Sequence, residues 1–195
     1  MNDVIFRASK LFNNYFIKTR YIFYYNKVND LLDSERKNLR ILRLCDLEAP
    51  FIENLPKMLI GKFHSLSEKK SWLLVTYGTD CSFKGYMLLH LPKKIEWYDS
   101  LPTKICEARI CGLFVFPEFR GKGIAGQLVR FGIEYCSKRE IEIWSVVEKL
   151  NSSSMTTMRK EGGVTKRKNY LIKILSRNFI SICTNPINIY FVYRK

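Results

Sequence analysis

A turn with three glycines in six residues is the segment of this sequence best suited to chemistry. It lies within Pro117-Glu118-Phe119-Arg120-Gly121-Lys122-Gly123-Ile124-Ala125-Gly126-Gln127-Leu128. Glycine lets the main chain approach a ligand closely and adopt the positive φ values that side chains disfavour. A helix that begins here presents free N–H groups and its positive dipole end, which together favour an anion. Because Arg120 and Lys122 add positive charge, the turn predicts a phosphate or pyrophosphate site.

Three phosphate-binding patterns compete for this turn. A Walker loop requires GxxxxGK[ST], but Gly126 is followed by Gln127 rather than by lysine. Residues 121–126 do match the letters GxGxxG of a dinucleotide fingerprint. That fingerprint also needs the first strand of an alternating βαβ array and an acidic residue about 20 positions further on, at the end of a second strand. Because neither is evident here, a third pattern fits best.

The turn resembles the acyl-CoA-binding motif of the GNAT (N-acetyltransferase) superfamily, which is [Q/R]-x-x-G-x-[G/A]. The matching residues are Arg120-Gly121-Lys122-Gly123-Ile124-Ala125, and an apolar run followed by Pro117 and Glu118 leads into them as it does in the family. Downstream, a second series keeps the family's spacing. It comprises Asn151, Ser154, Met158 and Gly162, with Lys160 in its usual place. The two motifs together indicate the family, and the match covers about residues 39–175.

The resemblance implies where an acyl-CoA co-substrate binds. Main-chain groups of Leu113, Phe114 and Val115, on a strand that splays from its neighbour, are implied to hold the pantetheine arm. The residues implied to hold the pyrophosphate are Arg120, Gly121, Lys122, Gly123, Ile124, Ala125 and Gly126. Asn151 is implied to contact the cofactor arm, and a role as N-cap of the next helix is compatible with that. We expect acetyl-CoA or another acyl-CoA and no metal, since His64 and His90 show no ligand spacing.

The implied reaction is direct attack of an amine or hydroxyl on a thioester, which requires a base or a water relay. Donors near the carbonyl oxygen stabilise the charge that develops there. Glu107, thirteen residues before Arg120, is the candidate base, with a surface carboxylate as the alternative interpretation. Many family members have a tyrosine at the Met158 position that protonates the thiolate, and methionine cannot do so. Tyr135, Tyr170 or water could replace it, or the protein is not a catalyst.

The hydrophobic pattern around the turn predicts an α+β domain of largely antiparallel strands with inserted helices. The resemblance specifies a GNAT-like mixed sheet with a splayed pair of strands and helices on both faces. We expect strands at 21–25, 39–44, 72–77, 86–91, 108–116, 141–147, 171–175 and 187–193. Helices are expected before residue 21, in the segment that follows the strand at 39–44 up to residue 66, at 124–137 and at 152–160. Residues 92–104 are expected to form a loop. Residues 1–38 are expected to form an extension that packs on or caps a GNAT-like domain at 39–195.

Composition excludes several classes of protein. The 195 residues are 47% apolar, which is too many for a disordered chain and enough for one domain with a core. No run approaches about 18 uncharged apolar residues, and the N-terminus lacks a signal-peptide pattern. The six dispersed cysteines contain no CxxC pair and favour reduced thiols. These features predict a cytoplasmic protein.

Positive charge is concentrated near the C-terminus. Of the net charge of +15, residues 148–195 carry +8, from ten Lys and Arg against two Glu. This predicts an anionic partner, with a solvated basic face as the alternative. We expect a small-molecule acceptor such as an amino sugar or a nucleotide-linked sugar, held by Lys166-Arg167-Lys168 and aromatic residues of 92–104. The alternatives are a macromolecular acceptor, such as aminoacyl-tRNA or protein, and a non-catalytic module that binds a ligand or a membrane surface.

Overall fold

A nine-stranded sheet is the framework of the protein. The computed structural model describes residues 17–25, 36–46, 71–79, 82–174 and 178–193. The strands lie in the order β11-β10-β9-β1-β8-β7-β4-β3-β2. Their bounds are β1 Ile17–Tyr25, β2 Leu39–Arg43, β3 Trp72–Thr79, β4 Ser82–His90, β7 Glu107–Val115, β8 Glu142–Glu148, β9 Gly163–Ile174, β10 Asn178–Cys183 and β11 Asn188–Tyr193. The predicted α+β class with a mostly antiparallel sheet is confirmed.

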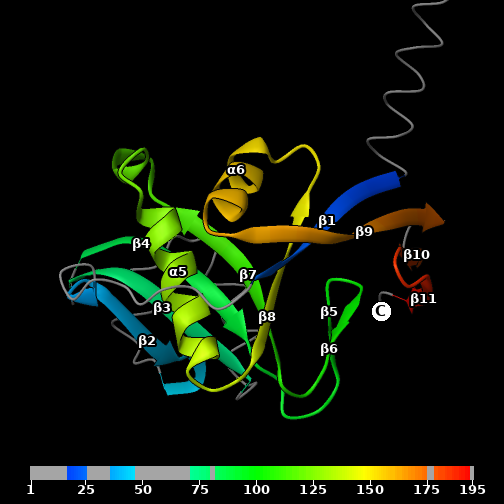
Figure 1. Cartoon of the computed structure of the whole chain (residues 1–195), viewed down its shortest axis with the longest axis horizontal. Coiled ribbons are helices and arrows are strands. Elements are labelled where there is room, and N and C mark those ends of the chain that lie inside the picture. Colours follow the sequence, from blue (N-terminus) through cyan, green and yellow to red (C-terminus); the bar gives the residue numbers. More distant parts are fainter. Residues whose placement is uncertain (1–16, 26–35, 47–70, 80–81, 175–177, 194–195) are drawn as a thin grey trace, which may run out of the picture.

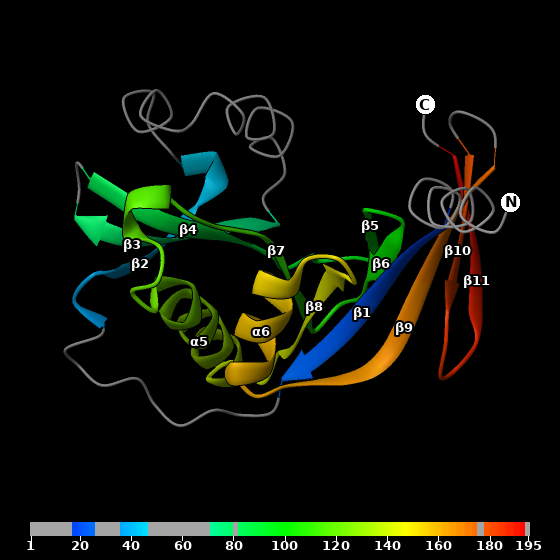
Figure 2. The same ribbon diagram turned by 90° about the horizontal axis from the view of Figure 1, so that it is seen from above.

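Two α-helices, a small hairpin and two short 3-10 helices, Leu44–Asp46 and Pro117–Phe119, complete the described elements. Helices α5 (Ile124–Ser137) and α6 (Ser152–Lys160) coincide with the two downstream helices that we predicted. Both lie on the same side of the sheet (Figure 2). The expected loop at 92–104 is wrong in part, because β5 (Glu96–Tyr98) and β6 (Leu101–Thr103) pair there as a hairpin. No helix in the described parts of the chain is long and apolar enough to cross a membrane.

Strands β7 and β8 form the parallel pair at the centre of the sheet. Their register runs from Glu107 opposite Glu142 to Ile110 opposite Ser145 and then stops, although both strands continue. Figure 1 shows the two strands together in their first halves and apart in their second halves. Beyond residue 110, β7 keeps its antiparallel pairing with β4 on the other side, up to Val115 opposite Gly85. The splayed pair of strands expected from the resemblance is therefore present.

A β-bulge shapes the free half of β7. Met87 of β4 pairs with Leu113 and Leu88 pairs with Cys111, so Gly112 is an extra residue. Gly112 adopts a φ of 64°, a left-handed conformation that a residue with a side chain rarely takes. The bulge bends β7 at the point where its pairing with β8 ends.

The main core lies between the sheet and the two helices. Helix α5 contributes Leu128, Val129 and Ile133 at helical spacing, and each is at most 1% exposed. They pack with β7 residues such as Ala108 and Ile110 in one cluster. Since side chains alternate along a strand, the residues between these, including Arg109, face the opposite side of the sheet.

Strand β1 lies inside the sheet, between β8 and β9. It pairs antiparallel with both strands, with Tyr24 opposite Trp144 of β8 and Arg20 opposite Asn169 of β9. Its Phe23 side chain is fully buried in the core beneath the helices. Part of the segment that we expected to form an extension thus supplies an interior strand. The helix expected before residue 21 is wrong over residues 17–20, which belong to β1 because this alternating segment pairs with β9 and, from Arg20 on, also with β8. The rest of that helix, and the helical segment expected up to residue 66 beyond Asp46, lie outside the described residues.

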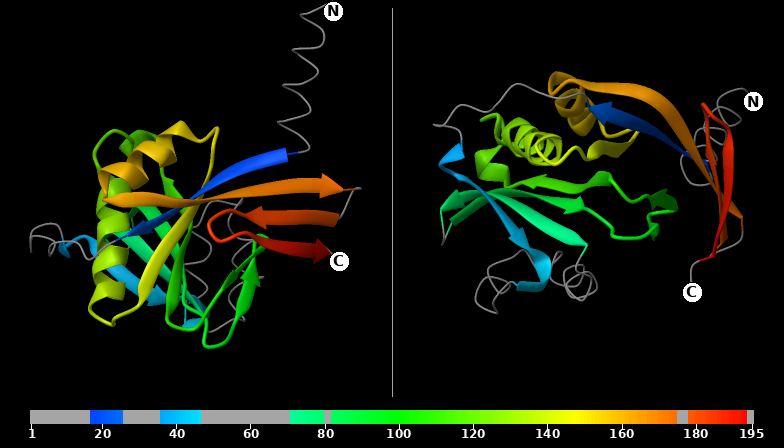
Figure 3. Two further views of the ribbon diagram at one scale, coloured as in Figure 1. Left: turned by 45° about the vertical axis from the view of Figure 1, so that its right-hand side comes forward. Right: turned by 60° about the horizontal axis from the view of Figure 1, so that its bottom comes forward.

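The C-terminal strands are longer and more numerous than the sequence indicated. Strand β9 begins at Gly163 rather than near residue 171, and β10 was not predicted. Strands β10 and β11 lie at the end of the sheet far from α5 (Figure 3). The Trp97 ring of β5 meets the Tyr190 ring of β11 edge to face, with 5.1 Å between ring centroids, which joins the small hairpin to this end.

Candidate functional site

The glycine turn opens α5 as the sequence predicted. Gly121 and Gly123 have φ values of 77° and 75°, and a Cβ atom at either would meet no other atom within 4 Å. Open space therefore lies above both residues. The first hydrogen bond of α5 runs from the Gln127 amide to the Gly123 carbonyl oxygen. Helix geometry leaves the amides of the three residues before Gln127, which include Ile124 and Ala125, without intrahelical acceptors.

Positive side chains surround this helix terminus. Arg120 and Lys122 are exposed, and Arg120 Nε donates a 3.1 Å hydrogen bond to the Val115 carbonyl oxygen. Lys84 Nζ and Lys122 Nζ lie 5.6 and 5.3 Å from the centre of the Phe119 ring. Three cations thus lie around the residues that precede the positive end of the helix dipole, which favours a phosphate group there.

Gly126 differs from the other two glycines of the turn. A Cβ atom there would overlap the carboxylate of Glu161, which accepts a 2.8 Å hydrogen bond from Arg130 Nε. Gly126 is buried, and its lack of a side chain lets α5 approach the residue that follows α6. Close helix packing accounts for this glycine independently of any bound phosphate.

The free half of β7 leads from the centre of the sheet to the turn. Leu113, Phe114 and Val115 are half-buried and follow the bulge at Gly112. No strand among the described residues pairs with this half on its β8 side, so the main-chain groups that do not bond β4 face the opening between β7 and β8.

Asn151 lies across this opening, just after β8. Its Oδ1 atom accepts a 3.1 Å hydrogen bond from the Ser154 amide and caps α6. The N-cap role is confirmed, whereas contact with a cofactor arm stays a prediction.

The arrangement suits a long ligand with phosphates at one end. Free amides, cations and glycines without Cβ atoms are the groups that favour bound phosphates, and unpaired strand edges carry main-chain donors and acceptors. The described residues contain no group of three or more His, Cys, Asp or Glu side chains placed to hold a metal ion.

A family model described as the acetyltransferase (GNAT) family matches residues 47–162, more than half of the chain. This chain belongs to the GNAT acetyltransferase family. The matched segment includes β7, the turn, α5, β8 and α6. No curated protein matches the chain.

Solved structures share the GNAT fold at low sequence identity. A GNAT-family protein from Novosphingobium aromaticivorans is 12% identical, with a TM-score of 0.54, over 79% of this chain and 62% of its own. A GNAT acetyltransferase from Colwellia psychrerythraea is 14% identical, with a TM-score of 0.52, over 97% and 62%. A glucosamine N-acetyltransferase region of a fungal multi-domain β-N-acetylglucosaminidase is 12% identical, with a TM-score of 0.51, over 83% and 22%. The chain thus spans less than two thirds of the length of each.

In this GNAT domain Glu107 lies at the closed end of the β7–β8 pair. Its Oε2 atom accepts a 3.0 Å hydrogen bond from the Lys104 amide, and it is opposite Glu142 in the register. Eight residues of extended strand, about 26 Å, separate Glu107 from Val115. The base role stays a prediction, and the observed contact also fits a carboxylate that caps a turn.

Met158 lies beside a tyrosine that sequence reasoning missed. The Tyr25 hydroxyl of β1 is 2.7 Å from Met158 Sδ and 2.7 Å from Ser145 Oγ of β8. Tyr135 instead packs against Arg139 near the end of α5, and Tyr170 lines a pocket beside β1. Tyr25 is 133 positions from Met158 in the sequence, so only the strand order shows that the two side chains are in contact.

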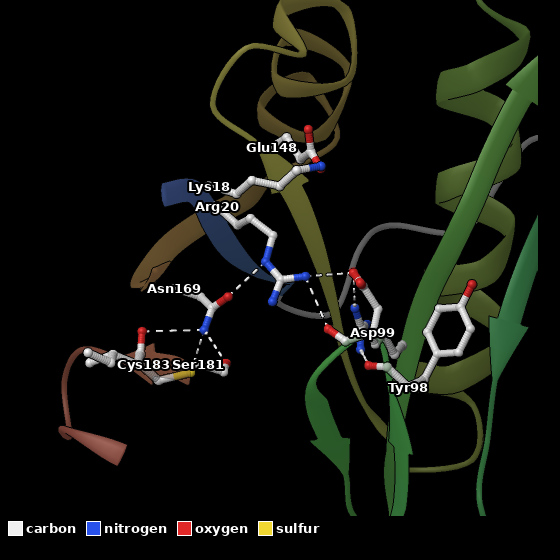
Figure 4. Close-up of polar contacts among 10 residues, drawn as sticks. Lys18, Arg20, Tyr98, Asp99, Glu148, Asn169, Ser181 and Cys183 are labelled. Atoms are coloured by element: carbon white, nitrogen blue, oxygen red, sulfur yellow. Dashed lines mark hydrogen bonds and ion pairs between the residues drawn. The ribbon is translucent and has the colours of Figure 1, made fainter. Parts of the chain in front are cut away.

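A second group that the sequence did not reveal lies on the opposite face of the sheet. Arg20 and Arg109 are each 2% exposed and share the carboxylate of Asp99, at 2.6 Å from Arg20 Nη1 and 3.5 Å from Arg109 Nη2. Arg20 Nε also donates a 2.7 Å hydrogen bond to Asn169 Oδ1 (Figure 4). Burial lowers the pKa of Arg20, an effect that Asp99 opposes. A guanidinium group nevertheless stays charged at neutral pH.

This arginine pair carries one excess positive charge beside the point where β7 and β8 part. Arg109 directly precedes Ile110, and its guanidinium carbon lies 5.0 Å from the centre of the Trp144 ring. The buried Nη2 of Arg20, Nε of Arg109 and Nε1 of Trp144 have no hydrogen-bond partner among the described residues. Unused buried donors next to an excess charge favour an anionic group at this position.

Two pockets lie beside β8, and neither is at the glycine turn. One of about 530 Å³ is at the carboxyl end of β8, on its β1 side, and is lined by Ile17, Lys18, Thr19, Glu148, Lys149, Leu150 and Tyr170. The other, of about 350 Å³, is at the amino end of β8 and includes Tyr25 and Ile133. Neither pocket contains a residue of the turn.

Proposed function

We propose that this GNAT domain transfers an acetyl or other acyl group from acyl-CoA to the amine of a small anionic metabolite. The observation that carries the proposal is the pair of left-handed glycines, Gly121 and Gly123, that opens α5 beside two parting parallel strands. Acyl-CoA supplies an activated thioester. The turn amides with Arg120 and Lys122 hold its pyrophosphate, and the edges of residues 113–115 orient its arm.

The arginine pair supports an anionic acceptor. Arg20 and Arg109 lie on the face of the sheet opposite α5 and α6, so an acceptor bound there approaches the parted strands from the side away from the helices. A carboxylate or phosphate of the acceptor compensates the excess charge and can be bidentate to a guanidinium group. An amino sugar carrying a phosphate or a nucleotide meets this requirement.

Calorimetric titration with acetyl-CoA tests the cofactor site. We expect micromolar binding to the wild type and at least a hundredfold loss in the double variant Arg120→Ala, Gly123→Asp, which removes one cation and places a negative side chain in the cradle. Gly162→Ala is the matched control, since Gly162 also has a positive φ, 80°, and open space at its Cβ, but lies at the far end of α6. Absence of binding by the folded wild type would overturn the proposal.

Paired amines test the acceptor class. Glucosamine and glucosamine 6-phosphate differ only in the phosphate, and the former is the substrate in the name of one structural neighbour. We expect CoA release to be at least tenfold faster with the phosphorylated amine, and an Arg109→Gln variant to lose that preference. Equal rates with both amines would remove the requirement for an anion.

Macromolecular acceptors remain the second candidate because of the basic stripe on β9. Lys166 Nζ and the Arg167 guanidinium carbon lie 5.4 and 5.6 Å from the Tyr24 ring centre, an interleaving that suits a phosphate backbone. Retention of RNA with a steep salt dependence, combined with no turnover of small amines, would favour that acceptor class.

We infer a cytoplasmic location from the buried free thiols Cys111, Cys136 and Cys183.

A further inference from the structure

A buried hydroxyl pair lies where the parallel strands separate. Ser145 is the last residue of β8 in register with β7, and its Oγ atom is 2.7 Å from the Tyr25 hydroxyl. Tyr25 is 7% exposed and Ser145 is 1% exposed. The other contact of the phenol is Met158 Sδ, and a thioether is a weak acceptor. The phenol proton therefore has no strong acceptor beyond the serine oxygen among its described contacts.

The Tyr25 ring points toward the open half of the pair. The register that places Tyr24 opposite Trp144 makes Ile143 the neighbour of Tyr25, yet the phenol reaches Ser145, two residues further along β8. Two residues of strand correspond to about 6.6 Å. A Cβ atom at Gly163 would come within 2.9 Å of Tyr25 Cε1, so the ring occupies the space that this glycine leaves. The orientation of the phenol is thus set by packing on both sides.

We propose that Tyr25, delivered by the N-terminal strand, is the general acid that protonates the departing CoA sulfur. This inference rests on the proposed function, in which the edges of residues 113–115 orient the arm of acyl-CoA, and it takes the thioester to lie between the parted strands. The attacking nitrogen forms a bond to the carbonyl carbon, and the carbon–sulfur bond breaks with its electron pair moving to sulfur. The Tyr25 O–H proton passes to sulfur, and the phenolate takes up the proton that the nitrogen releases. The protein ends the cycle unchanged.

This assignment explains how the protein can have methionine at position 158, where many family members have the tyrosine that protonates the thiolate. A tyrosine at that position on α6 would direct a phenol to the space beside Ser145, and Tyr25 reaches the same space from β1. A tyrosine phenol is protonated at neutral pH, and burial keeps it so by raising the pKa of Tyr25 above its ordinary value.

Binding of free CoA, with its ionisable thiol, tests the role without an acceptor. A phenol that donates to the thiolate lowers the pKa of the bound thiol below its free value of about 8.5. Wild-type affinity for CoA should therefore rise between pH 6 and 9, by about tenfold, as expected for a hydrogen bond to a charged group. In Tyr25→Phe, which keeps the ring, the rise should disappear. Acetyl-CoA, which has no thiol, should bind both proteins equally at every pH.

A rescue variant and an optical measurement complete the test. Met158→Tyr in the Tyr25→Phe background returns a phenol from α6 and should restore the pH dependence. Titration of the thiolate absorbance of CoA on the wild type provides a result that needs no variant. An unchanged CoA pKa, or equal pH dependence in Tyr25→Phe, would overturn the acid role while leaving the cofactor site intact. Failure of the wild type to bind either ligand would instead overturn the proposed function.

Discussion

At the scale of single residues, the three glycines of the turn have different reasons to be glycine. Gly121 and Gly123 need a left-handed backbone and have open space above them, whereas Gly126 fills a tight contact with Glu161. Glycine in this motif therefore provides conformational freedom at positions 121 and 123 and close packing at position 126. Only the first two leave room for a ligand to approach the main chain.

We expect Gly126→Ala to destabilise the fold more than Gly121→Ala does. The new methyl group at Gly126 displaces the Glu161 carboxylate from Arg130, and such overpacking costs about 1–3 kcal/mol. At Gly121 the cost is the left-handed conformation alone, about 1 kcal/mol. Urea unfolding of both variants measures the difference. A larger loss at Gly121 would contradict this account.

At the scale of elements, β1 contributes side chains to the candidate groups on both faces of the sheet. One face of the strand directs Tyr25 to Ser145 beneath the helices, and the other directs Arg20 to Asp99 in the turn of the β5–β6 hairpin. Asp99 and Ser100 both adopt positive φ values, 49° and 65°, which produce the tight turn that presents the carboxylate. An interior strand and a two-residue turn thus fix the arginine pair.

We expect Asp99→Asn to lower the free energy of unfolding by about 1–2 kcal/mol, because it removes the carboxylate shared by two buried guanidinium groups, although that carboxylate is 41% exposed and partly screened by solvent. Addition of a phosphorylated amine should recover part of this loss, since an anion would replace the carboxylate. Thermal unfolding with and without glucosamine 6-phosphate measures both effects. Glu107→Gln is the control and should change stability by less than about 0.5 kcal/mol. Equal stability of Asp99→Asn and the wild type would show that the pair contributes nothing.

At the scale of the whole molecule, buried acids make the fold sensitive to alkali. Burial raises the pKa of the Cys136 thiol to about 12, from an ordinary value of 9.0, and raises the pKa values of Tyr25 and Tyr86. Below pH 9 the folded and unfolded states both keep the Cys136 proton. Above pH 9 the unfolded state loses it while the folded state retains it, so stability falls as pH rises.

We expect the free energy of unfolding to fall steeply between pH 9 and 11, with about 1 kcal/mol per pH unit due to Cys136. Cys136→Ala should be less stable at pH 8 because of the cavity, but its stability should fall less steeply with pH. Urea titrations at several pH values measure the two slopes. Parallel slopes would show that the Cys136 thiol titrates alike in both states.

The sequence by itself determined the elements that local patterns encode. The glycine turn, the boundaries of α5 and α6, the strands β3 and β4 and the central strand all follow from periodicity and turn residues within a few positions. The free amides of the turn and the cations Arg120 and Lys122 are local in the same way, since they occupy one short segment, whereas Lys84 reaches the turn from β4.

Tertiary structure alone decided the groups that are distant in sequence. Nothing near Tyr25 indicates that its hydroxyl meets Ser145 and Met158, and nothing near Arg20 indicates Asp99, because these contacts depend on β1 lying between β8 and β9. Hydrophobic alternation tells which residues of a strand face a core but not which strands become neighbours. The strand order is set by packing of the whole sheet, and it places a phenol on one side of the parted strands and two arginines on the other.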